Sequence, residues 1–402
     1  MVLLVLIIPL FISFLKIYRS EGITHRLWLI GIYFFTALLG LIYLYTPCEQ
    51  TQIYDCGFFS VVFYTICLYF FLLPILKVNV KPQLNDDKRI IKYIVAILII
   101  GASAMYIYTV RTFDIATFAY GWADVKRQYY EVLKGDALTY TAIDARILIN
   151  LRPILFLSFP LFFYYLSIGN KKMAIVLFVC ACASVIEAIT RAERQAMIIW
   201  MINFVFYFLM FRNKLPKNIL SITKKAFYIV GGVFIFILGA ITVARYGDGH
   251  DGGVLDSLFA YGGAQVHNAC YFLENLGGQE LWGQLNFPYI TKTDTFLEIS
   301  DLVVADRYLN VFGSIVGSYI LDFGYLSLFL AICIAVLFIF LIKNVGRRRP
   351  FLQFYFYAIF VQVMTYGIFY NKMTSSTEIR TFITFAIFIL LFGSKKKSQV
   401  SF

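Results

Sequence analysis

The sequence predicts an all-α polytopic membrane protein, and three observations support this class. Hydrophobic residues make up 60% of the 402 residues and charged residues only 14%, whereas soluble domains are usually about half apolar and about a quarter charged. The mean hydropathy is +0.77. The apolar residues also gather in runs close to the roughly twenty residues that cross a bilayer. A soluble fold is therefore excluded.

The apolar runs follow one another from the N-terminus and predict about eleven transmembrane helices. The first run, 1–15, has neither a basic flank nor a small-residue cleavage site, so we expect a first span and not a removable signal peptide. The further predicted spans are 27–45, 58–76, 93–110, 147–168, 173–190, 196–211, 226–244, 325–342, 351–370 and 379–393. Without an internal repeat or a low-complexity linker, we expect one polytopic domain over 1–402.

Basic residues fix the expected topology. Loops rich in lysine and arginine occur at every second connection, namely 16–26, 77–92, 169–172, 212–225, 343–350 and 394–397. Such loops mark the cytoplasmic side, so the N-terminus is expected outside and the C-terminus inside. Because most of the net charge of +12 lies beside apolar runs, it is a topology signal, and nucleic acid is not expected as a partner.

The two faces differ in the kind of basic residue. On this topology the inner face holds 15 lysines and 7 arginines, and the outer face holds 4 lysines and 9 arginines. The topology was fitted to total charge, but the ratio of arginine to lysine was not. Lysine suffices for membrane retention, whereas the planar guanidinium group grips phosphate oxygens in a bidentate way. The arginine bias therefore indicates a phosphate-bearing ligand on the outer face.

Two outer segments are long, 111–146 and 245–308. The second, between the eighth and ninth spans, is expected to be a large polar loop that contributes the active site, because sites are often built on loops held by a rigid scaffold. Cys48 and Cys56 share another outer loop, and both a disulfide and two free thiols are consistent with the sequence.

Several arginines stand at the outer ends of predicted spans. Glu187, Arg191 and Arg194 share one helical face, and arginines at a helix N-terminus oppose the macrodipole unless an anion binds there. Arg245 follows the eighth span directly. The alternative is interfacial snorkelling with Glu187 as the ion-pair partner. The remaining outer arginines, Arg111, Arg127, Arg146, Arg152 and Arg380, have acidic residues to pair with at Asp114, Asp124, Glu131, Asp144 and Glu378.

The 245–308 segment offers candidate bases. His250 and Asp251 lie in a glycine-rich turn after Arg245, which fits a phosphate cradle, a placed base or a solvated connector. A calcium or zinc site there is disfavoured because the acidic set of an EF-hand and any zinc spacing are missing. No metal or other cofactor is expected. One of four residues is expected to act as a general base toward a sugar hydroxyl: His250, His267, Asp251 or Asp294.

Polar and aromatic residues alternate further along the same segment. The polar set is Gln265, His267, Asn268, Glu274, Asp294 and Asp301, and the aromatic set is Tyr261, Tyr271, Phe272, Trp282, Phe287 and Tyr289. This pattern is typical of a sugar-binding surface, in which rings pack on pyranose faces and polar groups bind hydroxyls. The alternative is an extramembrane cap with a small core of its own.

A half-length apolar run follows Asp306-Arg307-Tyr308-Leu309-Asn310 and ends at Asp322-Phe323-Gly324, after which a full span begins. A carboxylate at that depth needs a partner, for which Arg307 and Arg380 are the candidates.

Three of these features together resemble the Wzy-type oligosaccharide repeat-unit polymerases of bacterial O-antigen and capsule assembly. They are an arginine followed by an apolar span (Arg194-Gln195-Ala196-Met197-Ile198-Ile199), a large outer loop late in the chain, and Asn310-Val311-Phe312 followed by Asp322-Phe323-Gly324. The resemblance covers about residues 187–342, and the first half of the chain agrees only in hydropathy.

The resemblance implies a glycosyltransferase on a GT-C-like helical scaffold in the bacterial cytoplasmic (inner) membrane, active at its outer face without a metal. A glycan on undecaprenyl pyrophosphate would be transferred to a second lipid-linked repeat unit, with membrane lipid and a polysaccharide chain-length regulator as further partners. Arg191, Arg194 and Arg245 would then bind the pyrophosphate. His250 or His267 would orient or deprotonate the acceptor, and three residues would shape the site where the loop re-enters the membrane: Arg307, Asn310 and Asp322.

Two other functions stay open at this point. An O-antigen ligase uses the same donor with a lipid-core sugar as acceptor. A lipid-linked oligosaccharide flippase or another transporter would place charges along a central cavity, and the near absence of charge at mid-span positions argues against it.

Overall fold

The computed structural model describes twelve stretches of the chain and three single positions between them: 2–45, 56–80, 84, 88–112, 147, 150–190, 194–246, 254–275, 281–287, 291, 303–304, 307–308, 313–345, 349–371 and 376–393. These residues form two compact units. Unit 1 comprises Met1–Val80, Gly249–Arg347 and Gln353–Ile379, and unit 2 comprises Lys81–Asp248, Arg348–Leu352 and Arg380–Phe402. The single domain over 1–402 stays a prediction.

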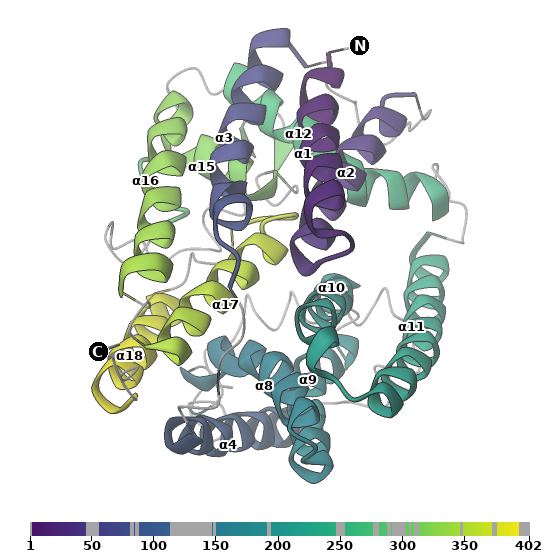
Figure 1. The fold of residues 1–402 in the computed structure, drawn as a ribbon. Coiled ribbons are helices and arrows are strands. Elements are labelled where there is room, and N and C mark those ends of the chain that lie inside the picture. The colour runs from purple at the N-terminus through teal and green to yellow at the C-terminus, as the bar shows by residue number, and fades with distance from the viewer. Residues whose placement is uncertain are drawn as a thin grey trace. The chain divides into compact units, whose positions relative to one another are not determined.

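Unit 1 is built from helices that pack side by side (Figure 1). They are α1 (Leu4–Glu21), α2 (His25–Tyr43), α3 (Phe58–Lys77), α12 (Val254–Asn275), α15 (Ser314–Phe323), α16 (Ser327–Phe340) and most of α17 (Pro350–Tyr366). A 3-10 turn, Gly324–Leu326, joins α15 to α16, and a π-helical turn, Leu341–Val345, follows α16. The strands β1 (Val303–Val304) and β2 (Arg307–Tyr308) form one short antiparallel pair.

Unit 2 contains α4 (Lys88–Thr112), α8 (Ser158–Ser167), α9 (Lys171–Thr190), α10 (Arg194–Phe211), α11 (Lys217–Tyr246) and most of α18 (Ser376–Phe392). Two 3-10 turns, Arg152–Leu157 and Arg212–Lys214, precede α8 and α11. The run 147–168 therefore does not form one continuous α-helix. Pro153 fits the start of its 3-10 turn because proline lacks the N–H that a helix interior needs.

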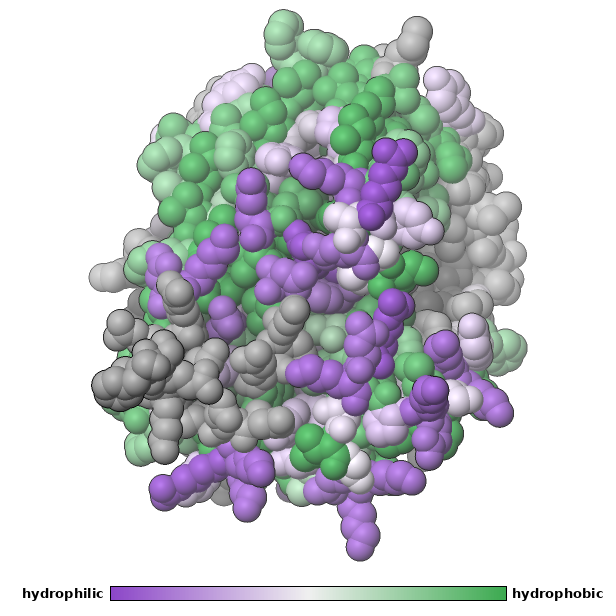
Figure 2. Space-filling view, viewed as in Figure 1, coloured by the Kyte–Doolittle hydropathy of each residue, from purple (hydrophilic) through white to green (hydrophobic). Residues whose placement is uncertain are grey.

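Six helices among the described residues are long and apolar enough to cross a membrane: His25–Tyr43, Phe58–Lys77, Lys88–Arg111, Lys171–Ile189, Gln195–Lys214 and Ser314–Val345. In unit 1, large apolar side chains are exposed along α1, α3 and α16, for example Ile12, Phe59 and Phe329. Figure 2 shows this as the continuous green surface over these helices. Such a surface is costly in water and stable in lipid. The predicted class of helical membrane protein is confirmed, and the number of eleven spans stays a prediction.

The half-length run before the ninth span is confirmed as α15, a buried helix of ten residues. Its first backbone N–H groups have no partner within the helix. Ser314 N donates to Phe369 O at 3.0 Å, and Ile315 N donates to Gly367 O at 2.8 Å. At its other end, Gly324 has φ +49°, a conformation that favours glycine, and it separates α15 from α16.

The 245–308 segment is not one outer loop. The helix α11 continues to Tyr246, and the 22-residue helix α12 occupies Val254–Asn275. Residues 263–270 of α12 are buried, and this helix packs mainly against α2, α15 and α3. The outer position of the segment stays a prediction, but this part of it is a helix packed in unit 1 and not an irregular loop. The polar residues of this segment suggested a loop exposed to water, whereas Gln265, His267 and Asn268 are buried in α12.

Glycines allow α12 to approach α2 closely. A Cβ atom at Gly263 would lie 2.6 Å from Leu39 O and 2.8 Å from Gly40 N, closer than real Cβ atoms come. Similarly, a Cβ atom at Gly40 would lie 3.1 Å from Gly263 O. The two backbones are thus in direct contact, in the manner of small-residue packing between membrane helices.

We expect Gly263→Ala to destabilise the protein by about 1–3 kcal/mol, because the added methyl group must push α12 away from α2. Without this contact, alanine in place of helical glycine would stabilise by roughly 1 kcal/mol. The measurement is the unfolding midpoint in detergent. Gly232→Ala is the matched control, since a Cβ atom there meets nothing within 4 Å. Equal midpoints for the two variants would contradict the close packing.

Candidate functional site

The polar face of α12 is buried. The exposed fractions of Gln265, His267 and Asn268 are 3%, 1% and 3%. The prediction that these residues belong to an open sugar-binding surface is therefore wrong. Their burial is nearer to the alternative of a small core, because α12 lies against three helices and not at the edge of a loop.

His267 is held at both ring nitrogens. Nε2 lies 3.0 Å from Gly40 O, and Nδ1 lies 3.4 Å from Cys56 Sγ. A carbonyl oxygen only accepts, so Nε2 carries the proton and donates it to Gly40. In the neutral ring Nδ1 is then an acceptor for the Cys56 thiol. With both nitrogens engaged inside the unit, His267 is poorly placed to act as a base toward a sugar hydroxyl.

Glu274 lies at the end of α12 and caps the start of α3. Its Oε1 accepts a hydrogen bond from Gly57 N at 2.9 Å, and Gly57 is the N-cap residue of α3. A carboxylate at a helix N-terminus also interacts favourably with the macrodipole. This contact fixes the segment around Cys56 and Gly57 against α12.

Asp322 lies at the end of α15 and is fully buried. Its carboxylate accepts hydrogen bonds from Leu285 N at 3.0 Å, from Asn286 N at 2.6 Å and from Asn286 Nδ2 at 2.5 Å. Asn286 Oδ1 in turn accepts from Asn371 Nδ2 at 2.7 Å. Among the described residues the partners of Asp322 are therefore neutral amides, and the predicted arginine partner is not found there. The carboxylate anchors a turn of the chain.

This turn presents an exposed aromatic ring. Leu281 N and Trp282 N donate to the carbonyl groups of Leu321 and Asp322 at 3.1 and 2.8 Å. These hydrogen bonds attach the turn to the last residues of α15. Trp282 has φ +50° and its side chain is 62% exposed. Of the aromatic residues that the sequence predicted for sugar binding, Trp282 is thus held in place and open to a ligand.

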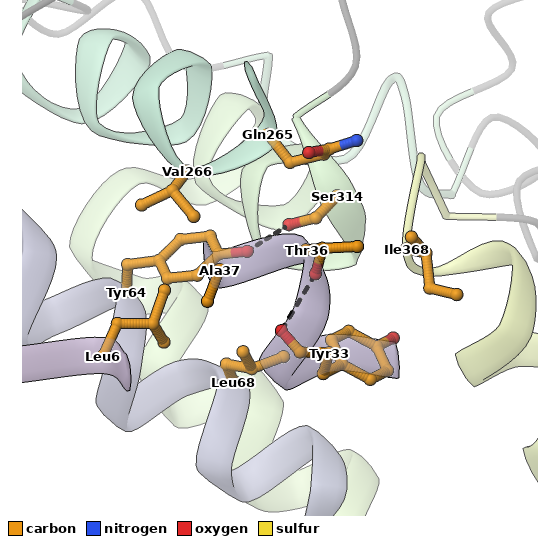
Figure 3. Close-up of a pocket in the computed structure, with 10 residues that line it drawn as sticks. All are labelled: Leu6, Tyr33, Thr36, Ala37, Tyr64, Leu68, Gln265, Val266, Ser314 and Ile368. Atoms are coloured by element: carbon orange, nitrogen blue, oxygen red, sulfur yellow. Dashed lines mark hydrogen bonds between the residues drawn. The ribbon is translucent and has the colours of Figure 1, made fainter. Parts of the chain in front are cut away.

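A small pocket with a cavity volume of about 10 Å³ lies between α1, α2, α3, α12 and the start of α15 (Figure 3). Tyr64 OH and Ser314 Oγ are 3.0 Å apart, and Tyr33 OH donates to Met364 O at 2.7 Å. Figure 3 shows Gln265 and Ser314 on one side, across from Leu6 and Leu68. A cavity needs about 10–15 Å³ to hold one water molecule, so this pocket is too small for a sugar.

In unit 2, basic residues gather at one end of the antiparallel helices α8, α9 and α10. Arg152 Nη2 lies 3.2 Å from Glu187 Oε2 near the end of α9, and the Glu187 side chain is only 4% exposed. The described part of the helix α10, Arg194–Phe211, includes the predicted span 196–211. Thr381 Oγ1 donates to Asn150 O at 3.1 Å, which brings Arg380 on α18 to the same end. We call Arg152, Arg194 and Arg380 the arginine end.

The opposite end of these helices carries mostly lysine. The α8–α9 and α10–α11 connections lie there, because α9 and α10 run antiparallel, as the hydrogen bond from Trp200 Nε1 to Ala181 O at 3.0 Å shows. The basic residues at these connections are Lys171, Lys172, Arg212, Lys214 and Lys217. Within unit 2, the separation of arginine from lysine that the sequence predicted is therefore present along the helices.

Arg191, His250, Asp251, Asp294 and Asn310 lie outside the described residues. For three others only the backbone position is described: Arg194 opens α10, Arg245 is the penultimate residue of α11, and Arg307 is in β2. Their roles stay predictions.

The sequence did not reveal the Asn286–Asn371 contact, the pairing of Tyr64 with Ser314, or the neighbours of Cys56. The partners lie 85, 250 and 211 residues apart along the chain, so no local pattern signals them. Among the described residues, no group of three metal-ligating side chains occurs.

No protein-family model, curated protein or solved structure matches this chain. A proposal for its function therefore rests on the residues and their placement.

We expect Asp322→Ala to destabilise the protein by roughly 3 kcal/mol, because it leaves buried amide donors of the 281–287 turn without an acceptor. The unfolding midpoint in detergent measures this. Asp322→Asn keeps one carbonyl oxygen and should lose less. If Asp322→Ala kept the wild-type midpoint and lost only activity, direct substrate binding by this residue would be favoured over an anchoring role.

Proposed function

We propose that this chain is a Wzy-type polymerase that joins undecaprenyl-pyrophosphate-linked oligosaccharide repeat units at the outer face of the bacterial cytoplasmic membrane. Its product would serve O-antigen or capsular polysaccharide biosynthesis. The proposal includes about eleven transmembrane helices on a GT-C-like scaffold, with the arginine end outward. The observation that carries it is the arginine end of unit 2, since the planar guanidinium group suits phosphate oxygens and the opposite end of the same helices carries mostly lysine.

Arg152 is set up to bind an anion. Its side chain is 43% exposed, while its partner Glu187 is almost fully buried. The buried carboxylate lies within ion-pair distance of the guanidinium group and limits where that group can lie, and a guanidinium group is well suited to binding phosphate oxygens. An oriented guanidinium group loses less side-chain freedom on binding phosphate than a mobile one.

Arg194 lies at the start of α10, so the backbone of this helix can also contribute to the proposed anion site. It opens α10, where the first backbone N–H groups have no partner within the helix and the macrodipole is positive. A cation at this position is unfavourable alone and favourable beside an anion. A pyrophosphate supplies that anion in membrane-bound sugar donors.

The chemistry follows from the leaving group. When the bond between the anomeric carbon and the pyrophosphate oxygen breaks, negative charge develops on that oxygen, and preorganised arginines stabilise it. The acceptor hydroxyl attacks the anomeric carbon and gives its proton to a base. His250, Asp251 and Asp294 are the proposed bases, because the ring nitrogens of His267 are engaged with Gly40 and Cys56.

Trp282 is the proposed contact for the sugars. Its exposed ring stands on a turn that Asp322 and Asn286 hold rigidly, and an aromatic face packs well against the apolar face of a pyranose. Asp322 then acts by positioning the turn and not by touching the substrate. The partners implied are two lipid-linked oligosaccharides, membrane lipid and a chain-length regulator.

We expect Arg194→Ala to reduce polymer formation by about 100-fold, the scale of losing one donor to a developing anion. Polymer length and yield would be measured in a polymerase-deficient strain that carries each variant. Arg194→Lys should retain part of the activity, since lysine keeps the positive charge but lacks the planar guanidinium group that binds two phosphate oxygens at once.

Arg212→Ala is the matched control, because it removes an arginine from the lysine-rich end of the same helix pair and should leave polymer yield unchanged. Equal yields for Arg194→Ala and wild type would overturn the assignment. Lipid-linked polymer that stays unattached to the lipid core in a knockout would indicate a ligase.

A further inference from the structure

Two cysteines from distant parts of the chain meet in unit 1. Cys56 directly precedes the N-cap residue of α3, and Cys270 lies in the last two turns of α12. Cys270 lies between His267 and Glu274 on one face of α12, and those two residues contact Cys56 Sγ and Gly57 N. This face therefore brings Cys270 beside Cys56, and each thiol shifts the pKa of the other. Cys56 is 7% exposed and Cys270 is fully buried. Proximity of two thiol groups is the first requirement of a disulfide.

The surroundings make the two thiols unequal. Cys56 also faces Nδ1 of His267, which accepts its proton because Nε2 donates to Gly40. The hydrogen bond from Cys270, together with that to His267, lowers the pKa of Cys56 despite its burial. The hydrogen bond to Cys56, together with burial, raises the pKa of Cys270. Cys56 is therefore the nucleophile of the pair, since the thiolate is the reactive form.

The backbone around the pair is held in place. Glu274, one turn after Cys270 on α12, accepts the hydrogen bond from Gly57 N at 2.9 Å. This contact is directly beside Cys56, so a covalent bond between the sulfur atoms would follow an alignment that the helices already have. Preorganisation of this kind lowers the conformational cost of forming the bond.

We propose that Cys56 and Cys270 form a redox site that a thiol–disulfide oxidant converts to a disulfide. The Cys56 thiolate attacks one sulfur atom of the oxidant's disulfide and forms a mixed disulfide, and the other sulfur leaves as a thiolate. Cys270 then gives up its proton and attacks Cys56 Sγ. The oxidant leaves as a dithiol that has gained two electrons and two protons, and the chain keeps the new bond.

The bond would staple α12 to the start of α3. Closing so long a stretch of chain restricts the unfolded state, so the oxidised protein should unfold at a higher temperature than the reduced one. It also forms only if this end of α3 meets an oxidising compartment. The inference does not depend on the proposed polymerase, because its readout is a covalent bond and not a sugar product.

The test is non-reducing peptide mapping of protein from acid-quenched cells, denatured in N-ethylmaleimide so that every free thiol is trapped. We expect one linked pair of peptides that contains Cys56 and Cys270, and alkylation of Cys48. After reduction, oxidised glutathione should restore the same link in the purified protein, with an upward shift in the unfolding midpoint.

Cys56→Ser and Cys270→Ser should each abolish the link and the shift. The double variant Cys180→Ser/Cys182→Ser is the matched control, since both residues lie in α9 of unit 2, and it should keep the link. Alkylation of both Cys56 and Cys270 in quenched cells would overturn the proposal, as would a link between Cys48 and Cys56.

Discussion

The close approach of α12 to α2 is the constraint on which the rest of unit 1 depends. Gly263 touches the backbone at Leu39 and Gly40, and this contact brings His267 within 3.0 Å of Gly40 O. A polar side chain in an apolar interior must find an internal partner, or its burial costs several kcal/mol. With α12 in place, His267 reaches Cys56, and Glu274 reaches the start of α3.

Features that depend on neighbouring residues could be predicted from the sequence. The length of the apolar runs predicted the membrane class. The half-length run that ends at Asp322-Phe323-Gly324 predicted a short segment, which is the helix α15. The helix over 196–211 also followed from its apolar run. The burial of α12 could not be predicted, because its glycines and polar residues read as a loop unless the helix that covers them is known. The partners of Asp322 lie 36 and 37 residues away.

The proposed ligand contacts of each unit differ in kind. Unit 2 supplies cations at the end of an apolar bundle, where Glu187 orients Arg152 and the start of α10 adds backbone N–H groups. Unit 1 supplies a rigid turn with an exposed ring at Trp282, held by a network of neutral amides around one buried carboxylate. The buried carboxylate of Asp322 thus anchors the backbone, whereas the arginine end is the proposed anion site, so the two roles fall on different residues.

The central claim is that this chain transfers a glycan from a lipid pyrophosphate. The most direct measurement is a reaction of the purified protein in liposomes with the undecaprenyl-pyrophosphate-linked repeat unit as the sole substrate. The account predicts lipid-linked products of increasing length together with released undecaprenyl pyrophosphate. Movement of the intact substrate across the bilayer without longer products would contradict it and would indicate a transporter.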